Sequence, residues 1–519
     1  MKNIIFTGAS LLALAIASPA FAQSMGNTSD IDQTGNTNNA MVTQTGSNAS
    51  DVDQVGNTNR ATVEQDGTAG DSTILQTGNN NRANTTQNTI GGLADVEQTG
   101  DFNESDITQT DGNGGGTLGV AGQDPEAFVT QTGNRNLSDV TQTNSAVSFD
   151  LIATVGQTGL LNDSTVTQSA TGAGSGNLNA SVTQFDGATS TVTQTTIDGS
   201  GSVNQDAIVM QTGANMSNIE QTFGLNGSND FLATVTQTGS GNESRVTQED
   251  FGSLANTVPD ENLTATVNQS GMGNISTIDQ LNKMATATVT QSGMMNISEV
   301  KQNGSNNMTV TVLQNGNDSM SFVDQKGNTN VVDVEQFGNN TKSNVTQTGR
   351  SNAAFVDQLV GSDGSQSMIT QTSPVNDRQW NRANVMQSAA DNMSEVTQTG
   401  NNGLANVTQS DADNESKVTQ NGTGPVTTAA MVSNTATVNQ SGTMGKSEVS
   451  QDGMMNDALL NQSGTENTAM VTQTGNGNDS DILQSNLSND AIVNQTSNGN
   501  VSNIVQSGTN GMVTVTQGM

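Results

Sequence analysis

The chain has 519 residues, a length sufficient for several ordinary domains. Only 31% of these residues are hydrophobic and 3% are aromatic, and the formal net charge is −35, a composition that on its own is typical of a disordered polymer. The acidic balance argues against nucleic acids and anionic membrane surfaces as partners, and the absence of cysteine excludes disulfide bonds.

The first 22 residues have the pattern of a secretory signal peptide of bacterial style. Lys2 precedes the apolar run IIFTGASLLALAIA, and an A-x-A cleavage pattern ends at Ala22. The run is too short for a stable transmembrane helix, and no later segment is apolar enough to span a bilayer. We therefore predict that residues 1–22 are removed. The mature chain is then expected to begin at Gln23, to have no transmembrane segment, and to be exported.

A repeat centred on glutamine fills the chain from Gln33 to Gln517. Forty units align on this glutamine, and 26 of the 39 intervals are eleven residues long. The unit reads Q-x-G-x-x-N-x-[AS]-x-[VI]-x-Q, and Val or Ile stands two places before the glutamine in 38 of the 40 units, with Thr85 and Leu460 as the exceptions. A disordered chain has no reason to keep such a register, so the repeat predicts a folded, repetitive structure.

Each unit has the pattern of one short β-strand followed by a tight turn. Ala or Ser, Val or Ile, and Gln stand two residues apart and therefore point to one side of a strand, while Thr, Asp, Glu and Asn fill the alternate places and face water. The glycine two places after Gln, and the Gly-, Asn- and Asp-rich residues beyond it, tolerate the positive φ angles of turns. A lone strand of this kind is unstable, but stacked copies are stable.

Two features show that the structural period is two units, about 22 residues. From Gln98 to Gln462, the residue four places before the glutamine is Ala or Val in one unit and Ser in the next; the phase is reversed up to Gln87 and after Gln473. Ten intervals exceed eleven residues, and nine of them follow a Ser-type unit, which indicates two different edges. We predict an all-β fold, a parallel β-solenoid of cross-β type with two strands per rung and about twenty rungs. At ~4.8 Å per rung the rod is on the order of 95 Å long.

Residues 23–519 are thus expected to form one solenoid interrupted by loops. The insertions are predicted near 110–126, 143–149, 169–178, 195–204, 222–231, 249–263, 372–382 and 421–433.

Stacking in register explains the recurring glutamine. Identical residues lie above one another in such a stack, so buried glutamine amides can hydrogen-bond along the column, whereas an isolated buried glutamine would be costly. Representative members of this core ladder are Gln98, Gln109, Gln131, Gln142, Gln325, Gln336, Gln398, Gln409, Gln473, Gln484 and Gln495.

The unit resembles the curlin repeat of curli-type bacterial functional amyloids. The pattern S-x5-Q-x-G-x2-N-x-A-x3-Q is similar to QTGNTNNAMVTQ at 33–44, and QTGDFNESDITQ at 98–109 matches with Ser105 in the Ala place. The resemblance implies secretion through a curli-type outer-membrane pore, a nucleator as partner, self-assembly into cross-β fibres, and roles in biofilm matrix and surface adhesion. The chain departs from short curlins in its many repeats, its long insertions, its lack of Tyr and His, and its strong acidic charge.

A parallel coil leaves an unpaired strand edge at each end, and here the repeat continues close to both termini. Stacking of further copies of the chain on these edges would not close and would therefore make a filament. The expected self-assembly residues are Ile31, Gln33, Val42 and Gln44 at one end and Ile504, Gln506, Val515 and Gln517 at the other.

Two other functions remain open from the sequence. One is a monomeric, rod-shaped surface adhesin that binds its target through the long loops. The other is an ice-binding β-solenoid, which is disfavoured because Asp, Glu and Asn interrupt the outward threonines. An enzyme is not expected, because without His or Cys the chain has no nucleophile–base pair, and no cofactor or metal site is predicted.

Overall fold

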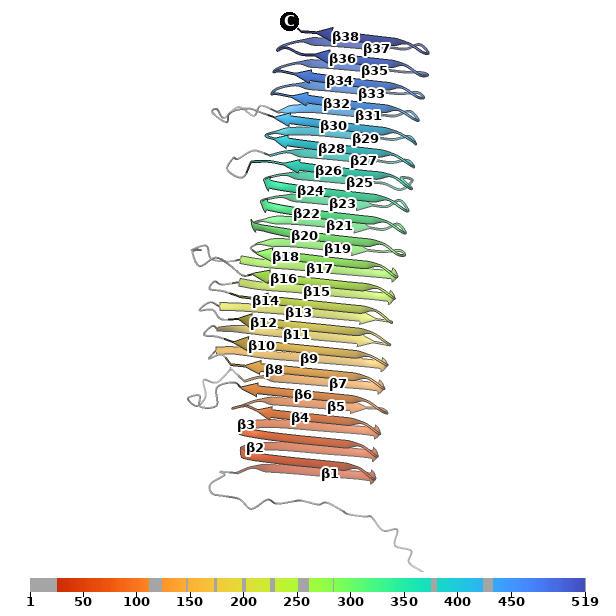
Figure 1. The fold of residues 1–519 in the computed structure, drawn as a ribbon. Helices are drawn as coiled ribbons and strands as arrows, with labels where there is room; N and C mark the ends of the chain where they lie inside the picture. The colour runs from red at the N-terminus through yellow and green to blue at the C-terminus, as the bar shows by residue number, and fades with distance from the viewer. Residues whose placement is uncertain are drawn as a thin grey trace, which may run out of the picture.

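The computed structural model shows a long rod built from β-strands (Figure 1). It describes residues 26–111, 124–145, 148–171, 175–197, 202–224, 229–250, 261–282, 284–374, 380–422 and 433–518. Within these ranges, every element of regular secondary structure is a β-strand. The predicted signal peptide, residues 1–22, lies outside the described residues.

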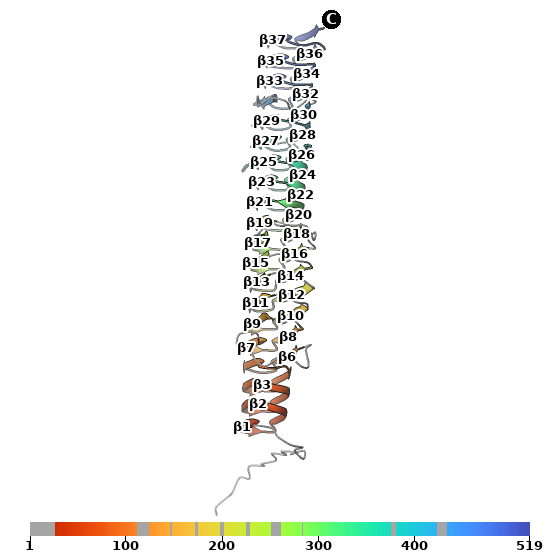
Figure 2. The same cartoon turned by 90° about the vertical axis from the view of Figure 1, so that its left-hand side faces the viewer.

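From β4 onward each strand pairs in parallel with the strand two places later in the chain, and β1, β2, β3 and β4 pair in sequence because β2 and β3 each span both sheets, so that the chain winds between two sheets. The odd sheet contains β1, the second halves of β2 and β3, and then the odd-numbered strands from β5 to β37. The even sheet contains the first halves of β2 and β3, and then the even-numbered strands from β4 to β38. From β6 and β7 onward, Figure 2 shows the odd-numbered labels along one side of the rod and the even-numbered labels along the other.

The two long strands at the start of the rod each contribute to both sheets: β2 (Asn39–Asn57) and β3 (Arg60–Asn79). The other strands of the odd sheet are β1 (Thr28–Asn36), β5 (Leu93–Thr99), β7 (Glu126–Asn134), β9 (Ser148–Leu160), β11 (Ser175–Phe185), β13 (Ser202–Thr212), β15 (Asn229–Ser240), β17 (Glu261–Met272), β19 (Ala285–Gln291), β21 (Met308–Gln314), β23 (Val331–Gln336), β25 (Ala353–Gln358), β27 (Arg382–Gln387), β29 (Gly403–Gln409), β31 (Asn434–Gln440), β33 (Asp457–Gln462), β35 (Asp479–Gln484) and β37 (Val501–Gln506). The other strands of the even sheet are β4 (Arg82–Asn88), β6 (Glu104–Asp111), β8 (Leu137–Asn144), β10 (Asp163–Thr171), β12 (Thr189–Ile197), β14 (Met216–Phe223), β16 (Glu243–Asp250), β18 (Ile275–Asn282), β20 (Ile297–Asn306), β22 (Met320–Asn328), β24 (Lys342–Arg350), β26 (Gln366–Thr372), β28 (Met393–Gly400), β30 (Glu415–Gly422), β32 (Lys446–Asp452), β34 (Thr468–Thr474), β36 (Asp490–Gln495) and β38 (Met512–Gln517).

The 38 strands form a solenoid of about 19 turns, which confirms the predicted all-β, two-strand-per-rung fold. Because β2 and β3 each hold two repeat glutamines, all forty glutamine units lie in strands. Pairing is in register, with Gln336 opposite Gln358 and Val334 opposite Val356, and the same match recurs along both sheets. The repeat period therefore sets the register of the whole stack.

The core is a thin layer of small and branched side chains between the two sheets. One continuous cluster of buried Ala, Val, Ile and Leu residues runs from Val52 to Ile504. The alternating burial along each strand is the reason that a chain with so few apolar residues can fold. From Val52 to Ile504, every repeat Val or Ile two places before the glutamine is buried by its neighbours one turn away.

The reversals of the Ala/Ser phase do not interrupt the stack. Near the start of the rod, Ser72 in the odd sheet pairs with Ala94, and near its end Ala458 pairs with Ser480 in the same sheet. Between these points the odd sheet carries Ala or Val and the even sheet carries Ser; outside them the assignment is exchanged. The solenoid is thus one body with two differently lined ends.

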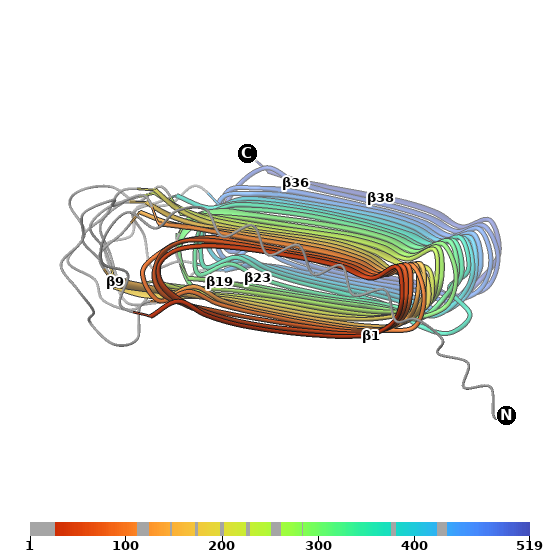
Figure 3. The ribbon, with the colours of Figure 1, turned by 90° about the horizontal axis from the view of Figure 1, so that it is seen from below.

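The two edges of the rod differ. The tight edge consists of the turns that lead from an odd-sheet strand to the next even-sheet strand, and the insertion edge consists of the segments that lead back. All eight predicted insertions fall between an even-sheet strand and the next odd-sheet strand, on the insertion edge, and their central parts lie outside the described residues. Figure 3 looks along the rod and shows the strands of successive turns superimposed.

A second apolar cluster lies beside the insertion edge. It contains Leu151, Ala170, Leu178, Val203, Phe223, Phe231, Leu263, Ala285 and Met308. The strands here run further into the predicted insertions than the repeat requires: β11 has 11 residues and β15 has 12, whereas β33 has six. The rings of Phe223 and Phe231 meet edge to face with centroids 6.3 Å apart. This extra burial explains how the rod accommodates long insertions without breaking its register.

Candidate functional site

The repeat glutamines form two continuous hydrogen-bonded ladders, one in each sheet. The side-chain Nε2 of each glutamine donates to Oε1 of the glutamine one turn later, with distances of 2.6 to 3.1 Å along the rod. The second hydrogen of the Nε2 group is donated to a backbone carbonyl of the facing sheet; Gln336, for example, donates to Gln358 at 2.8 Å and to the carbonyl of Met320 at 3.0 Å. Each buried amide is thereby satisfied without water.

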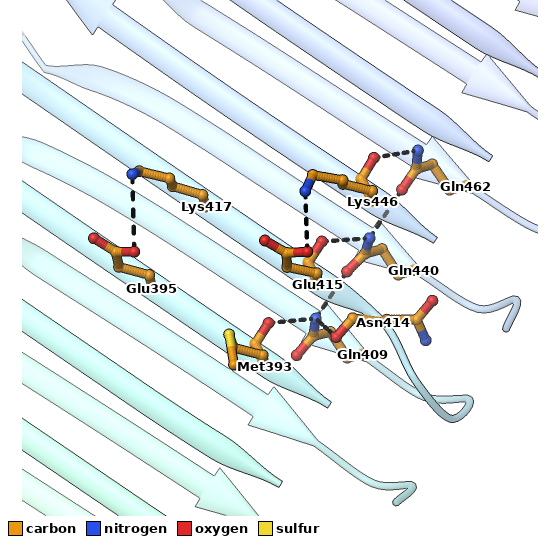
Figure 4. A network of polar contacts seen from close by, with 9 residues as sticks. All are labelled: Met393, Glu395, Gln409, Asn414, Glu415, Lys417, Gln440, Lys446 and Gln462. Carbon is orange, nitrogen blue, oxygen red and sulfur yellow. Dashed lines mark hydrogen bonds and ion pairs between the residues drawn. The ribbon is translucent and has the colours of Figure 1, made fainter. Parts of the chain in front are cut away.

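Figure 4 shows one stretch of a ladder from close by. Gln409 donates to Oε1 of Gln440 at 2.9 Å, and Gln440 donates in turn to Gln462 at 2.9 Å. Gln409 also donates to the carbonyls of Met393 and Asn414, both at 3.0 Å. The structure places all the glutamines predicted for the core ladder in these columns, each of them buried: Gln98, Gln109, Gln131, Gln142, Gln325, Gln336, Gln398, Gln409, Gln473, Gln484 and Gln495.

Both ladders have a direction. Every amide-to-amide bond runs from the glutamine of lower number to that of higher number, as from Gln33 to Gln54 at 2.6 Å and from Gln495 to Gln517 at 2.9 Å. Within the described part of the chain, no glutamine donates to Oε1 of Gln33 or Gln44. At the other end, Gln506 and Gln517 donate to backbone carbonyls but to no further glutamine.

A column of asparagines stacks at the turns. From the sequence, these asparagines were predicted only to tolerate the backbone angles of a turn. The amide N–H of Asn478 donates to Oδ1 of Asn456 at 3.1 Å, and Oδ1 of Asn478 accepts from the backbone N–H of Asn500 at 3.0 Å. Its Nδ2 donates to the carbonyl of Thr474, the last residue of β34, at 3.3 Å. The repeat does indicate that this asparagine faces inward, because it continues the two-residue spacing of the inward Ala/Ser, Val/Ile and Gln.

The small-residue columns of the two sheets differ in polarity. In the described residues, thirteen buried serines of this position carry a hydroxyl without a hydrogen-bond partner: Ser50, Ser105, Ser138, Ser217, Ser244, Ser276, Ser298, Ser321, Ser343, Ser367, Ser394, Ser416 and Ser447. Ser72 is different, because its hydroxyl lies 2.7 Å from that of Thr85 on the facing sheet. Thr85 is one of the two places where the repeat lacks Val or Ile before the glutamine. Here it forms a polar pair with Ser72, which replaces a contact between Ser and Val.

The outer faces carry stacked carboxylates. Asp30 pairs with Asp51 and Asp32 with Asp53 in the first turn. Burial, and then the nearby charges of Asp53, Asp30 and Asp32, raise the pKa of Asp51 above its ordinary value. Exposed ion pairs such as Lys446 Nζ to a Glu415 carboxylate oxygen, 3.1 Å apart (Figure 4), are of the kind that contributes little to stability.

Each end of the described rod presents a turn that is covered on one side only. At the N-terminal end, β1 pairs only with β2, all nine of its residues are exposed, and these include Ile31 and Gln33. The neighbouring Val42 is partly buried against the core.

At the C-terminal end, β37 pairs with β35 and β38 with β36. Ile504 and Gln506 remain buried there, while Val515 and Gln517 in β38 are partly exposed. Together with Gln44, these are the residues predicted from sequence as self-assembly edges, and the structure brings them to the two opposite ends of the rod.

Two stretches of the chain, residues 316–349 and 453–485, match the family model of the curlin associated repeat. These two stretches carry the curlin associated repeat. The resemblance predicted from sequence is confirmed for these stretches, which include β22, β23 and all but the last residue of β24 in the middle of the rod, and the whole of β33 to β35 near its end. No curated protein matches the chain.

The glutamine-centred repeats on either side of these stretches keep the same register and the same glutamine ladder. In the described ranges, no group of three or more acidic side chains is arranged to hold a metal ion. No helix within them is long and apolar enough to cross a membrane.

Proposed function

We propose that the chain is an extracellular structural protein that assembles end to end into curli-like amyloid fibres. These fibres would serve as biofilm matrix and in surface adhesion. The observation that carries the proposal is that the two end turns of the rod are uncovered on one side. Every internal turn, by contrast, is covered on both sides by turns of the same repeat. A further copy can extend both sheets and both glutamine ladders by the contacts already present inside the rod.

The proposed route follows from the predicted signal peptide and the curlin repeat. Residues 1–22 would direct export, a curli-type outer-membrane pore would secrete the chain, and a nucleator would start the fibre. The columns that supply fibre stability are amide ladders and packed Val and Ile, and this arrangement supports a structural rather than an enzymatic role.

Sedimentation and electron microscopy of the purified mature chain test the proposal. We expect the mature chain to pass with time from a monomer, smaller than the 53.3 kDa of the full 519-residue chain, to unbranched fibres that sediment at low speed. Thioflavin fluorescence should rise over the same interval. A chain that stays monomeric over a wide range of concentration, ionic strength and pH would contradict fibre formation.

A monomeric rod-shaped adhesin is the second candidate. It is favoured by the placement of all eight predicted insertions on one edge, where they would form a single binding face. In that case deletion of insertions such as 251–260 would abolish surface attachment while leaving the monomer folded. For a fibre subunit the same deletion would leave fibre growth unchanged.

A further inference from the structure

We propose that the outer face of the odd sheet over β15, β17, β19 and β21 binds ice. The partner is an uncharged crystalline solid that presents hydrogen-bonding groups in regular rows. The inference is independent of the proposed fibre function, because this face lies along the side of the rod, away from both end turns.

The outward residues of these four repeat units are almost all small and polar. Taken from five places before the repeat glutamine to one place after it, they occupy sixteen positions, of which ten are Thr, two Ser, two Asn and two Leu. None is charged, in a chain whose formal net charge is −35. We call these positions the threonine face. Its threonines are Thr234, Thr236, Thr238, Thr264, Thr266, Thr286, Thr288, Thr290, Thr309 and Thr311.

The opposite face of the rod is different at the same level. The corresponding sixteen positions of β16, β18, β20 and β22 hold eight charged residues and only two threonines. Some of these charges pair with one another, as Lys326 Nζ does with a carboxylate oxygen of Asp324 at 2.8 Å. Both sheets have the same repeat and register, so the fold itself does not require the threonine face to be uncharged. A charged group holds its own hydration shell, and a face without such groups suits a neutral crystal.

Pairing in register sets the threonines in rows along the rod. One row consists of Thr264, Thr286 and Thr309, and the next consists of Thr234, Thr266, Thr288 and Thr311. A third row holds Thr236 and Thr290 with Asn268 between them. Neighbours within a row are about 4.8 Å apart and the rows are about 6.6 Å apart, because these are the spacings between strands and between alternate residues of a strand. The oxygen atoms of ice repeat at spacings of similar size.

The hydroxyls of the threonine face are directed to solvent. Within the described part of the chain, none of these ten hydroxyls hydrogen-bonds to a protein group. Outward polar side chains nearby behave differently, since Nδ2 of Asn179 donates to Oδ1 of Asp206 at 2.8 Å, and Nδ2 of Asn204 donates to Oδ1 of Asp230 at 2.8 Å. Because a β-branched side chain has few χ1 rotamers, the hydroxyl and methyl groups of the face repeat with the backbone.

Free hydroxyls in rows restrict what can cover this face. A dry protein surface would leave the hydroxyls without partners, which is costly. The partner must instead bring a hydrogen-bonding group to each hydroxyl on the same two-dimensional pattern. Water molecules held between the methyl groups and bonded to the hydroxyls meet this requirement, and a layer of such water can join the surface of an ice crystal.

The acidic residues and asparagines that argue against an ice-binding role in the sequence lie mostly outside this face. Glu220 belongs to β14 in the even sheet, and Asp53 and Glu97 belong to β2 and β5 near the start of the rod. Asn268 lies within the face, where it interrupts only the third row. The structure thus separates an uninterrupted set of threonines that the sequence shows only as scattered members of the repeat.

Ice affinity of the full mature chain tests the inference. The unmodified chain should be concentrated in slowly growing ice, and should produce a gap between the melting and freezing points of a single ice crystal. Thr288→Glu places a charge at the centre of the face, between Thr266 and Thr311, and should remove most of both effects. The matched control is Thr277→Glu, at the same place of the unit on the even sheet between Arg245 and Glu299, and it should leave ice affinity unchanged.

A second variant separates disruption of the face from misfolding or charge repulsion. Thr266→Lys introduces a charge of the opposite sign in the same row and should also remove most of the ice affinity. The row already continues into Asp333 in β23, so a charged side chain is compatible with folding there. We expect both variants to keep the thermal unfolding and fibre growth of the unmodified chain.

Three results would overturn the inference. They are exclusion of the unmodified chain from growing ice, full ice affinity in Thr288→Glu or Thr266→Lys, and an equal loss of ice affinity in Thr277→Glu. Each of them leaves the proposed fibre function untouched. Conversely, a chain that binds ice but forms no fibres would contradict the proposed function and support this inference.

Discussion

The tight edge and the insertion edge are built from the same repeat but satisfy different constraints. On the tight edge, successive turns lie so close that a Cβ added to Gly100 would sit 1.9 Å from the carbonyl oxygen of Gly133. On the insertion edge the plain turns are equally close, since a Cβ added to Gly327 would sit 2.0 Å from the carbonyl oxygen of Gly349. Beside two of the insertions, however, the equivalent position two places after the glutamine holds Ala170 and Phe223, whose side chains pack into the second apolar cluster. The Gln, Val/Ile and Ala/Ser places belong to the strands and recur along the whole rod, whereas the glycine belongs to close turns.

This difference shows how the rod tolerates long insertions. Where the chain leaves the rod and returns, the strands lengthen and the column that holds asparagine elsewhere becomes Leu178, Phe231 and Leu263. Apolar packing thus replaces the asparagine ladder as the seal of the core. The predictions below test the separate contributions of the two edges and the two sheets.

The largest effect is expected at the insertion edge. Phe231→Ala removes a fully buried ring from the second cluster and should lower the free energy of unfolding by about 3–5 kcal/mol. Phe102→Ala is the control on the tight edge; its ring is 54% exposed and its removal should cost less than about 1 kcal/mol. Urea unfolding of the unassembled chain measures both, and equal losses would show that the second cluster does not support the insertions.

The second-largest effect is expected from breaking a glutamine ladder. Gln336→Leu leaves Nε2 of Gln314 without its acceptor and Oε1 of Gln358 without its donor, so we expect a loss of about 2–4 kcal/mol. Gln366→Leu, at an exposed place in β26, should be close to neutral. If the two substitutions had the same effect in urea unfolding, the ladder would contribute nothing beyond hydrophobic burial.

A methyl group in a tight turn should have a smaller effect. Gly100→Ala forces a Cβ against the backbone of the next turn at a φ of +113°, which should destabilise the rod by about 1–3 kcal/mol. The control is Gly156→Ala in β9, where the nearest atom to an added Cβ is 3.9 Å away. Thermal unfolding should separate the two variants, and a Gly100→Ala melting point equal to that of the control would refute the close contact.

The two sheets should respond oppositely to exchange of Ser and Ala. Ser343→Ala removes a buried hydroxyl without a partner and should stabilise the rod by about 1 kcal/mol. Ala405→Ser introduces such a hydroxyl into the odd sheet and should destabilise it by about 1–2 kcal/mol. Stabilisation by both changes, or by neither, would mean that the two columns are not distinct environments.

Acidification should stabilise the rod. Burial, followed by the charge of Asp333, raises the pKa of Asp357, and burial likewise raises the pKa of Asp333, so both carboxyls bind protons more readily when folded than when unfolded. Their contribution is fully present below the ordinary Asp pKa of about 3.9 and is lost as the pH rises through the higher folded-state value.

We therefore expect a higher melting temperature near pH 4 than near pH 7 at low salt, with a smaller difference in Asp357→Asn. A melting temperature that rises from pH 4 to pH 7 would reverse the assigned sign. Faster fibre assembly at low pH, at high salt or with divalent cations is expected for the same reason, because each reduces repulsion between stacked carboxylates.

The strand count, the parallel register and the glutamine ladders could be predicted because they depend on the strict period of the repeat. A period of two within the unit determines which residues face inward, and the alternation of Ala and Ser shows that two units make a turn. The second cluster was not predicted, because Leu151 and Phe231 stand beside interruptions of the repeat, at the place where the repeat unit has asparagine, although their two-residue spacing from the inward Ala and Val puts them on the same side of the strand. The Ser72–Thr85 pair was equally hidden, since it joins facing sheets and depends on how the two sheets interlock.

The most direct test of the central claim is X-ray diffraction from aligned fibres of the mature chain. If identical side chains stack in columns that continue from one copy to the next, the pattern has a sharp reflection at ~4.8 Å along the fibre axis, and a diffuse one near ~10 Å across it. A 4.8 Å reflection perpendicular to the axis, or none at all, would show that the strands do not stack along the fibre and would contradict the account.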